Sequence, residues 1–161
     1  MALELGVVSS AITVADVAFK SCKALHDLIQ GLHNAPAELE YLRTDLNEVG
    51  RTLNTFAGLK RQAGAHENAQ YRATLEHTFE QLQPCFQKLG STCDMFKASL
   101  DETFKHSTPD RMSSRDRFRF QFQDVDIERF RSHLSSYKNT LTIALGLASL
   151  YVSISSFICA N

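Results

Sequence analysis

The sequence contains no tryptophan and few of the residues that usually break regular structure, with three prolines and seven glycines among 161 residues. Folds made of many short strands need more turn residues than this, so the composition favours helices over a β-sandwich. Neither sign of charge dominates, since 17 basic residues stand beside 18 acidic ones. A nearly neutral chain has no overall field that attracts a polyanion, and we expect no nucleic-acid partner.

The motifs of catalysis and metal binding are missing as well. The four cysteines are widely spaced and never form a Cys-x-x-Cys pair, which argues against a zinc site and against a disulfide-stapled secreted domain. There is no Gly-x-Ser-x-Gly elbow, no His-Glu-x-x-His, no phosphate-binding glycine loop and no Rossmann fingerprint. We therefore expect no enzymatic activity, no cofactor and no bound metal.

Charge is absent from one long segment, because no charged side chain follows Lys138. The last predicted helix begins at Asp124, and beyond Lys138 it has apolar stripes on two opposite sides. A helix that is apolar all round is typically buried all round. Six Ser and Thr residues make this segment polar for a membrane span, although its length would suffice. The pattern predicts a last helix at the centre of a bundle.

Three further helices are indicated by apolar residues that recur every three or four positions. The first reaches about Leu32. The second begins at Pro36, has a heptad seam from Leu39 to Phe56, and is predicted to end in a loop flanked by Gly58 and Gly64. The third runs from about Ala65 to Phe104, with a kink or break at Pro84. We expect one domain over residues 1–161, an all-α up-and-down bundle of four to five helices with a central C-terminal helix.

A basic stretch follows the third helix and alternates with phenylalanines from Phe118 to Phe122, which we interpret as a short extended or helical lead-in to the last helix. Basic residues interleaved with aromatics are typical of surfaces that bind phosphates or anionic lipid headgroups. A solvated loop whose phenylalanines pack under the bundle is the more common arrangement, and both interpretations stay open. The candidate lipid-binding residues are Arg111, Arg115, Arg117 and Arg119.

The start of the first helix is uncharged from Leu5 to Ala15. Gly6 and Ser10 lie one turn apart, the spacing of small residues that lets helices approach closely in lipid. This segment spans only about half of the ~20 residues that cross a bilayer. Packing inside a bundle explains the same stripe equally well. The candidate membrane or oligomer residues are Leu3, Leu5, Gly6, Val7, Val8, Ser10, Ala11, Ile12, Val14 and Ala15.

Several strings resemble the HeLo-like N-terminal domain of fungal STAND (NLR-type) proteins. They are the start Leu5-Gly6-Val7-Val8-Ser9-Ser10-Ala11-Ile12, the break at Asn34-Ala35-Pro36 with the heptad helix after it, and Ser135-Ser136-Tyr137-Lys138-Asn139-Thr140-Leu141. The resemblance covers nearly the whole chain and rests on apolar and small residues rather than on catalytic signatures.

The resemblance implies an effector domain of regulated cell death and heterokaryon incompatibility. Such a domain is cytoplasmic at rest, self-associates on activation, and reaches membrane lipids through its first helix. It usually precedes a nucleotide-binding oligomerisation module in the same chain, and this sequence contains no such module. The alternative is a stand-alone helical adaptor that binds another protein without any membrane step.

Overall fold

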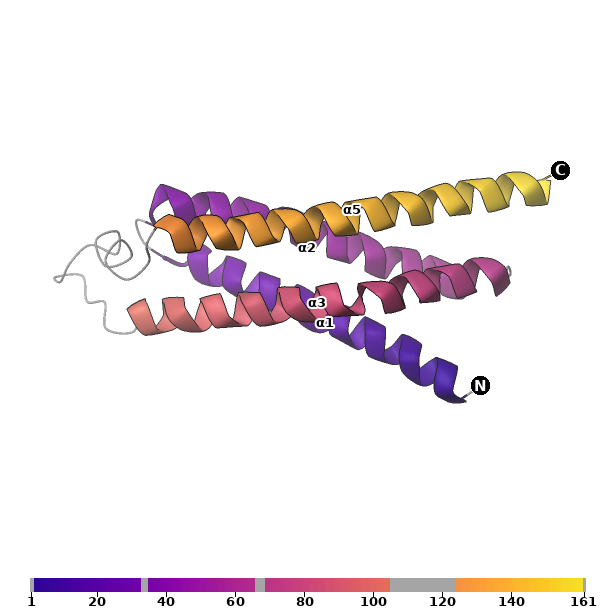
Figure 1. Ribbon diagram of the computed structural model, residues 1–161, viewed down its shortest axis with the longest axis horizontal. Helices are drawn as coiled ribbons and strands as arrows, with labels where there is room; N and C mark the ends of the chain where they lie inside the picture. The colour runs from indigo at the N-terminus through magenta and orange to yellow at the C-terminus, as the bar shows by residue number, and fades with distance from the viewer. Residues whose placement is uncertain (1, 33–34, 66–68, 105–123, 161) are drawn as a thin grey trace.

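The computed structural model describes residues 2–32, 35–65, 69–104 and 124–160, and for 2–12, 60–65 and a few single positions it describes the backbone only. These residues form four helices: α1 (Ala2–Gln30), α2 (Ala37–Ala65), α3 (Ala69–Phe104) and α5 (Asp124–Ala160). Consecutive helices run in opposite directions, so the two ends of the chain lie at the same end of the molecule (Figure 1). The predicted all-α, up-and-down bundle is confirmed over the described residues.

α1 follows its predicted stripe and ends where the sequence indicated. Ala18, Cys22, Leu25 and Ile29 are all buried, and they recur at steps of three and four residues. At the end of the helix the amide of Gly31 donates to the carbonyl of Asp27 at 3.0 Å. This bond satisfies one of the carbonyl groups that a helix end leaves open.

α2 begins one residue after Pro36, the residue at which the sequence predicts its start. The helix starts at Ala37 rather than at Pro36, and the carbonyl of Pro36 accepts from the amides of Leu39 at 3.0 Å and Glu40 at 3.2 Å. The heptad seam is confirmed, because each of its members is at most 3% exposed: Leu39, Leu42, Leu46, Val49, Leu53 and Phe56.

The predicted end of α2 is wrong. The helix continues through Gly58 and Gly64 to Ala65, and α3 correspondingly begins at Ala69 instead of Ala65. A glycine inside a helix costs only about 1 kcal/mol relative to alanine. Contacts made by the extra turns offset that cost, since Leu59 packs against buried Leu75 on α3.

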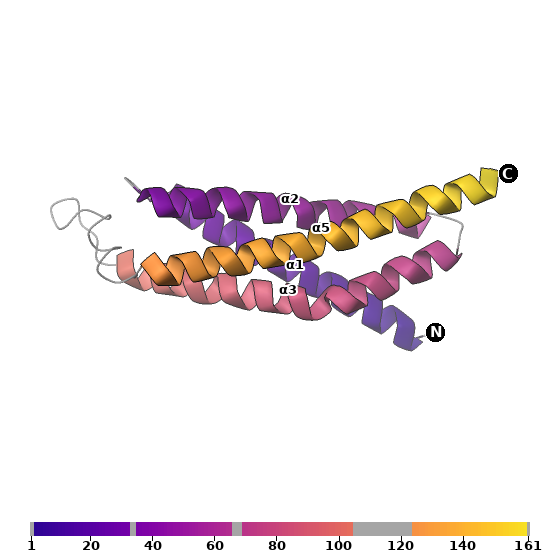
Figure 2. The ribbon, with the colours of Figure 1, turned by 45° about the horizontal axis from the view of Figure 1, so that its top comes forward.

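α3 passes through Pro84 without interruption. Figure 2 shows that the helix changes direction in its middle part, as expected where proline removes a backbone hydrogen bond. Its predicted stripe is confirmed, since all of these side chains are buried: Leu75, Phe79, Leu82, Phe86, Leu89, Cys93, Phe96 and Leu100.

α1 and α3 approach each other closely at Gly90. A Cβ atom added there would lie 3.5 Å from the Cα of Ala18 on α1. About one turn further along both helices, the sulfurs of Cys22 and Cys93 lie 3.7 Å apart as free thiols in the core. A Cβ atom at Gly90 would therefore be in ordinary van der Waals contact with α1, and a larger side chain there would have to displace that helix.

α5 packs on one side only, which corrects the prediction of a central, fully buried last helix. Its first stripe is buried at Ile127, Phe130, Leu134 and Leu141, and it lies against α2 and α3. The second stripe is at least half exposed: Ile143, Leu147, Leu150, Ile154 and Phe157. Two helices cover about one side of a third, and no described helix lies over the other side. An apolar residue on every side of a helix predicts burial on every side. The burial occurs only if enough other helices surround it, and this number cannot be read from the pattern of one helix.

Candidate interaction surface on α5

The second half of α5 exposes a row of large apolar side chains, which we call the α5 apolar surface. They are Ile143 (64% exposed), Leu147 (64%), Leu150 (57%), Ile154 (50%), Phe157 (71%) and Ile158 (68%). The first five recur at steps of four and three residues, so they lie along one face of the helix. Soluble monomeric proteins seldom leave a contiguous apolar patch of this kind in water unless it serves in an interaction.

The opposite face of the same segment holds it on the bundle. Leu141 and Ala148 are buried, and Ala144 and Leu145 pack partly against the core. Ala148 also belongs to a small separate cluster with Leu75, and Leu59 and Tyr151 pack against that cluster. The main core, by contrast, includes side chains from all four described helices. The second half of α5 thus buries two side chains, Leu141 and Ala148, whereas the first half buries three, those of Ile127, Phe130 and Leu134.

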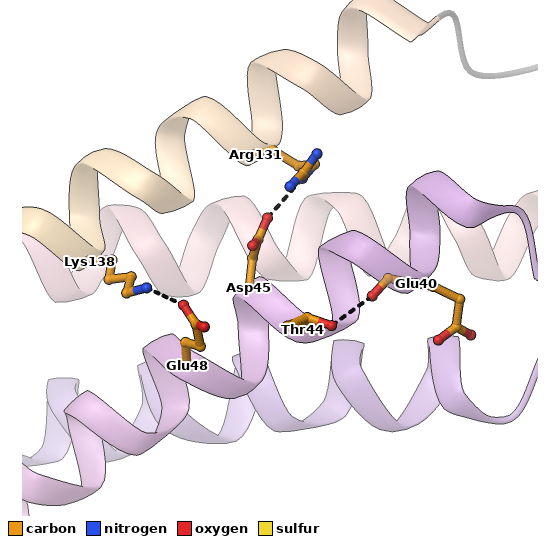
Figure 3. Close-up of polar contacts among 6 residues, drawn as sticks. All are labelled: Glu40, Thr44, Asp45, Glu48, Arg131 and Lys138. Atoms are coloured by element: carbon orange, nitrogen blue, oxygen red, sulfur yellow. Dashed lines mark hydrogen bonds and ion pairs between the residues drawn. The ribbon is translucent and has the colours of Figure 1, made fainter.

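The first half of α5 is held to α2 by two ion pairs (Figure 3). The Nε of Arg131 donates to the Oδ2 of Asp45 at 2.8 Å, and Lys138 donates to the carboxylate of Glu48. The hydrogen bond from Lys138 and its positive charge hold the pKa of Glu48 below its usual range. The guanidinium of Arg131 also lies 5.4 Å from the centre of the Tyr41 ring, within the range of a cation–π contact.

These ion pairs line a shallow groove between α2 and α5. Asp45, Glu128, Arg131 and Lys138 provide its charged side chains, two of each sign. Both cations already contact carboxylates, so the groove has no excess charge with which to bind an anion. The arrangement serves to position α5 rather than to bind a ligand.

The change from charged to uncharged along α5 is abrupt. The last charged side chain is Lys138, which pairs with Glu48, and the α5 apolar surface begins five residues later at Ile143. Among the described residues, one helical stretch, Asp126–Ile158, is long and apolar enough to cross a membrane by length and composition, and only 19% of its most apolar window is buried. A core helix of a soluble protein that passes the same test is mostly buried.

The predicted membrane residues of the first helix all lie in α1. Val14 and Ala15 are partly buried and pack against the core. The remaining candidates have side chains outside the described set: Leu3, Leu5, Gly6, Val7, Val8, Ser10, Ala11 and Ile12. The four arginines proposed for anionic lipid, Arg111, Arg115, Arg117 and Arg119, lie outside the described residues, as does the segment from Phe118 to Phe122.

Two of the described cysteines, Cys85 and Cys93, lie in environments that keep their thiols protonated. The contact with Cys22 and burial both raise the pKa of the Cys93 thiol, and burial raises the pKa of Cys85. A thiolate is the reactive form of cysteine, so these positions are poor nucleophiles. In the part of the chain that the structure describes, no three His, Cys, Asp or Glu side chains gather where they could hold a metal ion.

Sequence reasoning identified five residues of the α5 apolar surface, all but Ile158, as a second stripe but assigned them to the core. The signal that distinguishes the two cases is the complete absence of charge between Asn139 and Asn161. Core helices at the edge of a bundle normally have charged residues on their solvent side.

One family model matches residues 2–157, and its description is "Pigment biosynthesis cluster protein PigL N-terminal". Comparison with curated proteins and with solved structures gave no match.

Proposed function

Since this chain belongs to the family of PigL N-terminal domains, we propose that it is the signalling and effector domain of a fungal NLR-like protein and works as a HeLo-like bundle. It acts by self-association rather than by catalysis. The observation that carries this proposal is the α5 apolar surface, whose six large side chains are exposed in a single copy of the chain. Such a surface marks a contact with another molecule or with a membrane.

The mechanism follows from the two different halves of α5. In the resting state the chain is cytoplasmic, and the ion pairs from Arg131 and Lys138 hold the first half of α5 on α2. Activation brings several copies together through a nucleotide-binding module in the same protein. Clustering places several α5 apolar surfaces side by side, and this raises their joint affinity for a common target without any new contact.

The start of α1 is the other candidate for a membrane step, as the resemblance implies. Of its candidate residues, Val14 and Ala15 pack against the core, and they continue directly into Ala18 and Cys22, which are buried against α3. The side chains of the α5 apolar surface are exposed already, so their exposure requires no unfolding. We therefore assign the first contact to α5, and any exposure of α1 follows it.

The test is forced oligomerisation in cells. The chain of residues 1–161 is fused to a domain that oligomerises when a small molecule is added, and viability of the fungal host is measured with and without the inducer. We expect loss of viability only with the inducer. The double variant Leu147→Lys with Ile154→Lys should abolish the loss, because it places two charges on the α5 apolar surface.

The matched control is Met95→Lys, which changes an exposed apolar side chain on α3 (73% exposed) and should leave the effect intact. Normal growth while the wild-type chain is oligomerised and well expressed would overturn the proposal. The stand-alone adaptor would then take its place. Killing that occurs without the inducer, and equally in the Lys variant, would also contradict it.

A further inference from the structure

We propose that the second half of α5, from Asn139 to Ala160, inserts into a lipid bilayer, and that acyl chains are what the α5 apolar surface binds. This inference rests on the proposed function, because it names the partner of the same surface. Three features of this segment favour a lipid partner over a protein partner: its lack of charge, its length as a helix, and the hydrogen bonds of two of its hydroxyl groups.

Charge is the feature that separates a lipid partner from a protein partner. A helix that docks one face on another protein keeps charged residues on its remaining solvent side. Here the exposed positions between the large side chains are also uncharged, as at Thr142, Gly146 and Ser149. A bilayer surrounds a helix on all of its free sides and disfavours charge on each of them. The second half of α5 meets that requirement around its whole exposed circumference.

The length of the uncharged helix fits the bilayer. α5 continues as helix to Ala160, so the segment after Lys138 is about 33 Å long at 1.5 Å per residue. The hydrocarbon core of a bilayer is about 30 Å thick. Lys138 stands at the start of this segment, where a cation would meet the lipid headgroups.

Two of the six Ser and Thr hydroxyl groups of this segment have their hydrogen bonds satisfied inside the helix. Thr140 Oγ1 donates to the carbonyl of Ser136 at 3.0 Å, and Ser153 Oγ donates to that of Ser149 at 3.1 Å. A hydroxyl that bonds to the preceding turn of its own helix is satisfied inside the helix. The backbone groups of the helix are satisfied in the same way, as a bilayer requires. The Ser and Thr content that speaks against a span in the sequence is therefore less costly in the structure.

Insertion has a structural cost in the soluble bundle, which the transfer of the α5 apolar surface from water into lipid must offset. The second half of α5 would give up the burial of Leu141 and Ala148 and the cluster that includes Leu59, Leu75 and Tyr151. The main core contributed by α1, α2, α3 and the first half of α5 would remain. The two ion pairs to α2 lie before Asn139, so they could keep the bundle attached at the membrane surface.

The experiment exploits the absence of tryptophan from the whole chain. Leu150→Trp places a single fluorescent reporter on the α5 apolar surface, and Met95→Trp places one on α3 as the control. Each variant of the chain of residues 1–161 is mixed with vesicles of phosphatidylcholine, with or without phosphatidylglycerol. We expect the emission of Leu150→Trp to move to shorter wavelength and to be quenched by lipids brominated on their acyl chains. The Met95→Trp emission should change in neither respect.

A second variant measures how strongly the surface binds. Adding Leu147→Lys to Leu150→Trp should weaken vesicle binding about 100-fold, which corresponds to about 2.8 kcal/mol. Leu147 is exposed, so this variant should keep the helical circular dichroism and urea midpoint of its parent. Adding Met95→Lys instead should leave binding unchanged.

Three outcomes would overturn the inference. They are no spectral change with vesicles, a change that brominated acyl chains do not quench, and a change that occurs without vesicles and grows with protein concentration. The last would identify a second copy of this chain as the occupant of the α5 apolar surface. Failure here is distinguishable from failure of the proposed function. If induced oligomerisation kills the host but the chain does not bind vesicles, only the inference of a lipid partner is wrong. If the chain inserts into vesicles but induced oligomerisation does not kill the host, only the proposed signalling function is wrong.

Discussion

At the scale of single residues, two leucines of α5 differ sharply in environment although they lie less than two turns apart. Leu141 is fully buried, whereas Leu147 is 64% exposed. We expect Leu141→Ala to lower the free energy of unfolding by about 2–5 kcal/mol, and Leu147→Ala to change it by less than about 0.5 kcal/mol. Urea unfolding followed by circular dichroism measures both. Equal losses would show that the exposed face is covered in solution.

Two glycines give a second comparison at this scale. A side chain at Gly90 meets the backbone of Ala18, and one at Gly146 meets nothing within 4 Å. Gly90→Leu should therefore push α1 away from α3 and destabilise the bundle by about 1–3 kcal/mol. Gly146→Leu should stabilise it slightly, because leucine is the better helix former by several tenths of a kcal/mol. Thermal unfolding of the two variants tests this, and a tolerated Gly90→Leu would contradict the close contact.

At the scale of helices, the contact between α2 and α5 depends on pH through Glu48. Its pKa is lowered by Lys138, so the folded chain binds this proton less readily than the unfolded chain does. The pair thus contributes stability at neutral pH, and the contribution is lost as pH falls through the lowered pKa. Glu48→Gln should flatten the decline in unfolding midpoint below about pH 5. Glu76→Gln, which changes an exposed carboxylate of α3, should leave the decline as in the wild type. Identical profiles for Glu48→Gln and wild type would contradict the ion pair.

The helices also show what the sequence could and could not predict. The seam from Leu39 to Phe56 was predictable, because each member recurs at the helical period and finds a partner helix. The end of α2 was not, since Gly58 signals a stop locally while Leu59 gains contacts from a distant helix. The exposed face of α5 was misassigned for a related reason. The sequence pattern shows which side chains are apolar. Whether they are buried depends on how many helices pack around α5, which is a property of the tertiary structure.

At the scale of the molecule, the chain consists of a bundle and an apolar extension of one of its helices. Deleting residues 139–161 should leave a helical protein that still unfolds cooperatively, because the main core is formed mostly before Asn139. Its urea midpoint should fall, since Leu141 and Ala148 are lost. The deletion should also make the chain more soluble, as it removes the α5 apolar surface. Loss of all helical signal would show that the segment belongs to the folding core.

The two ion pairs between α2 and α5 have a consequence for the register of the helices. Apolar seams such as those of α2 and α5 repeat along their length, so leucines alone would also fit after a slide along the axis. A slide of one turn moves each side chain by about 5.4 Å. A slide of that size would break the ion pair of Arg131 with Asp45 and the ion pair of Lys138 with Glu48 at the same time. Exposed pairs of this kind contribute little to stability, yet they fix one axial position of α5, and that position decides which part of the helix remains beside the bundle and which part lies open.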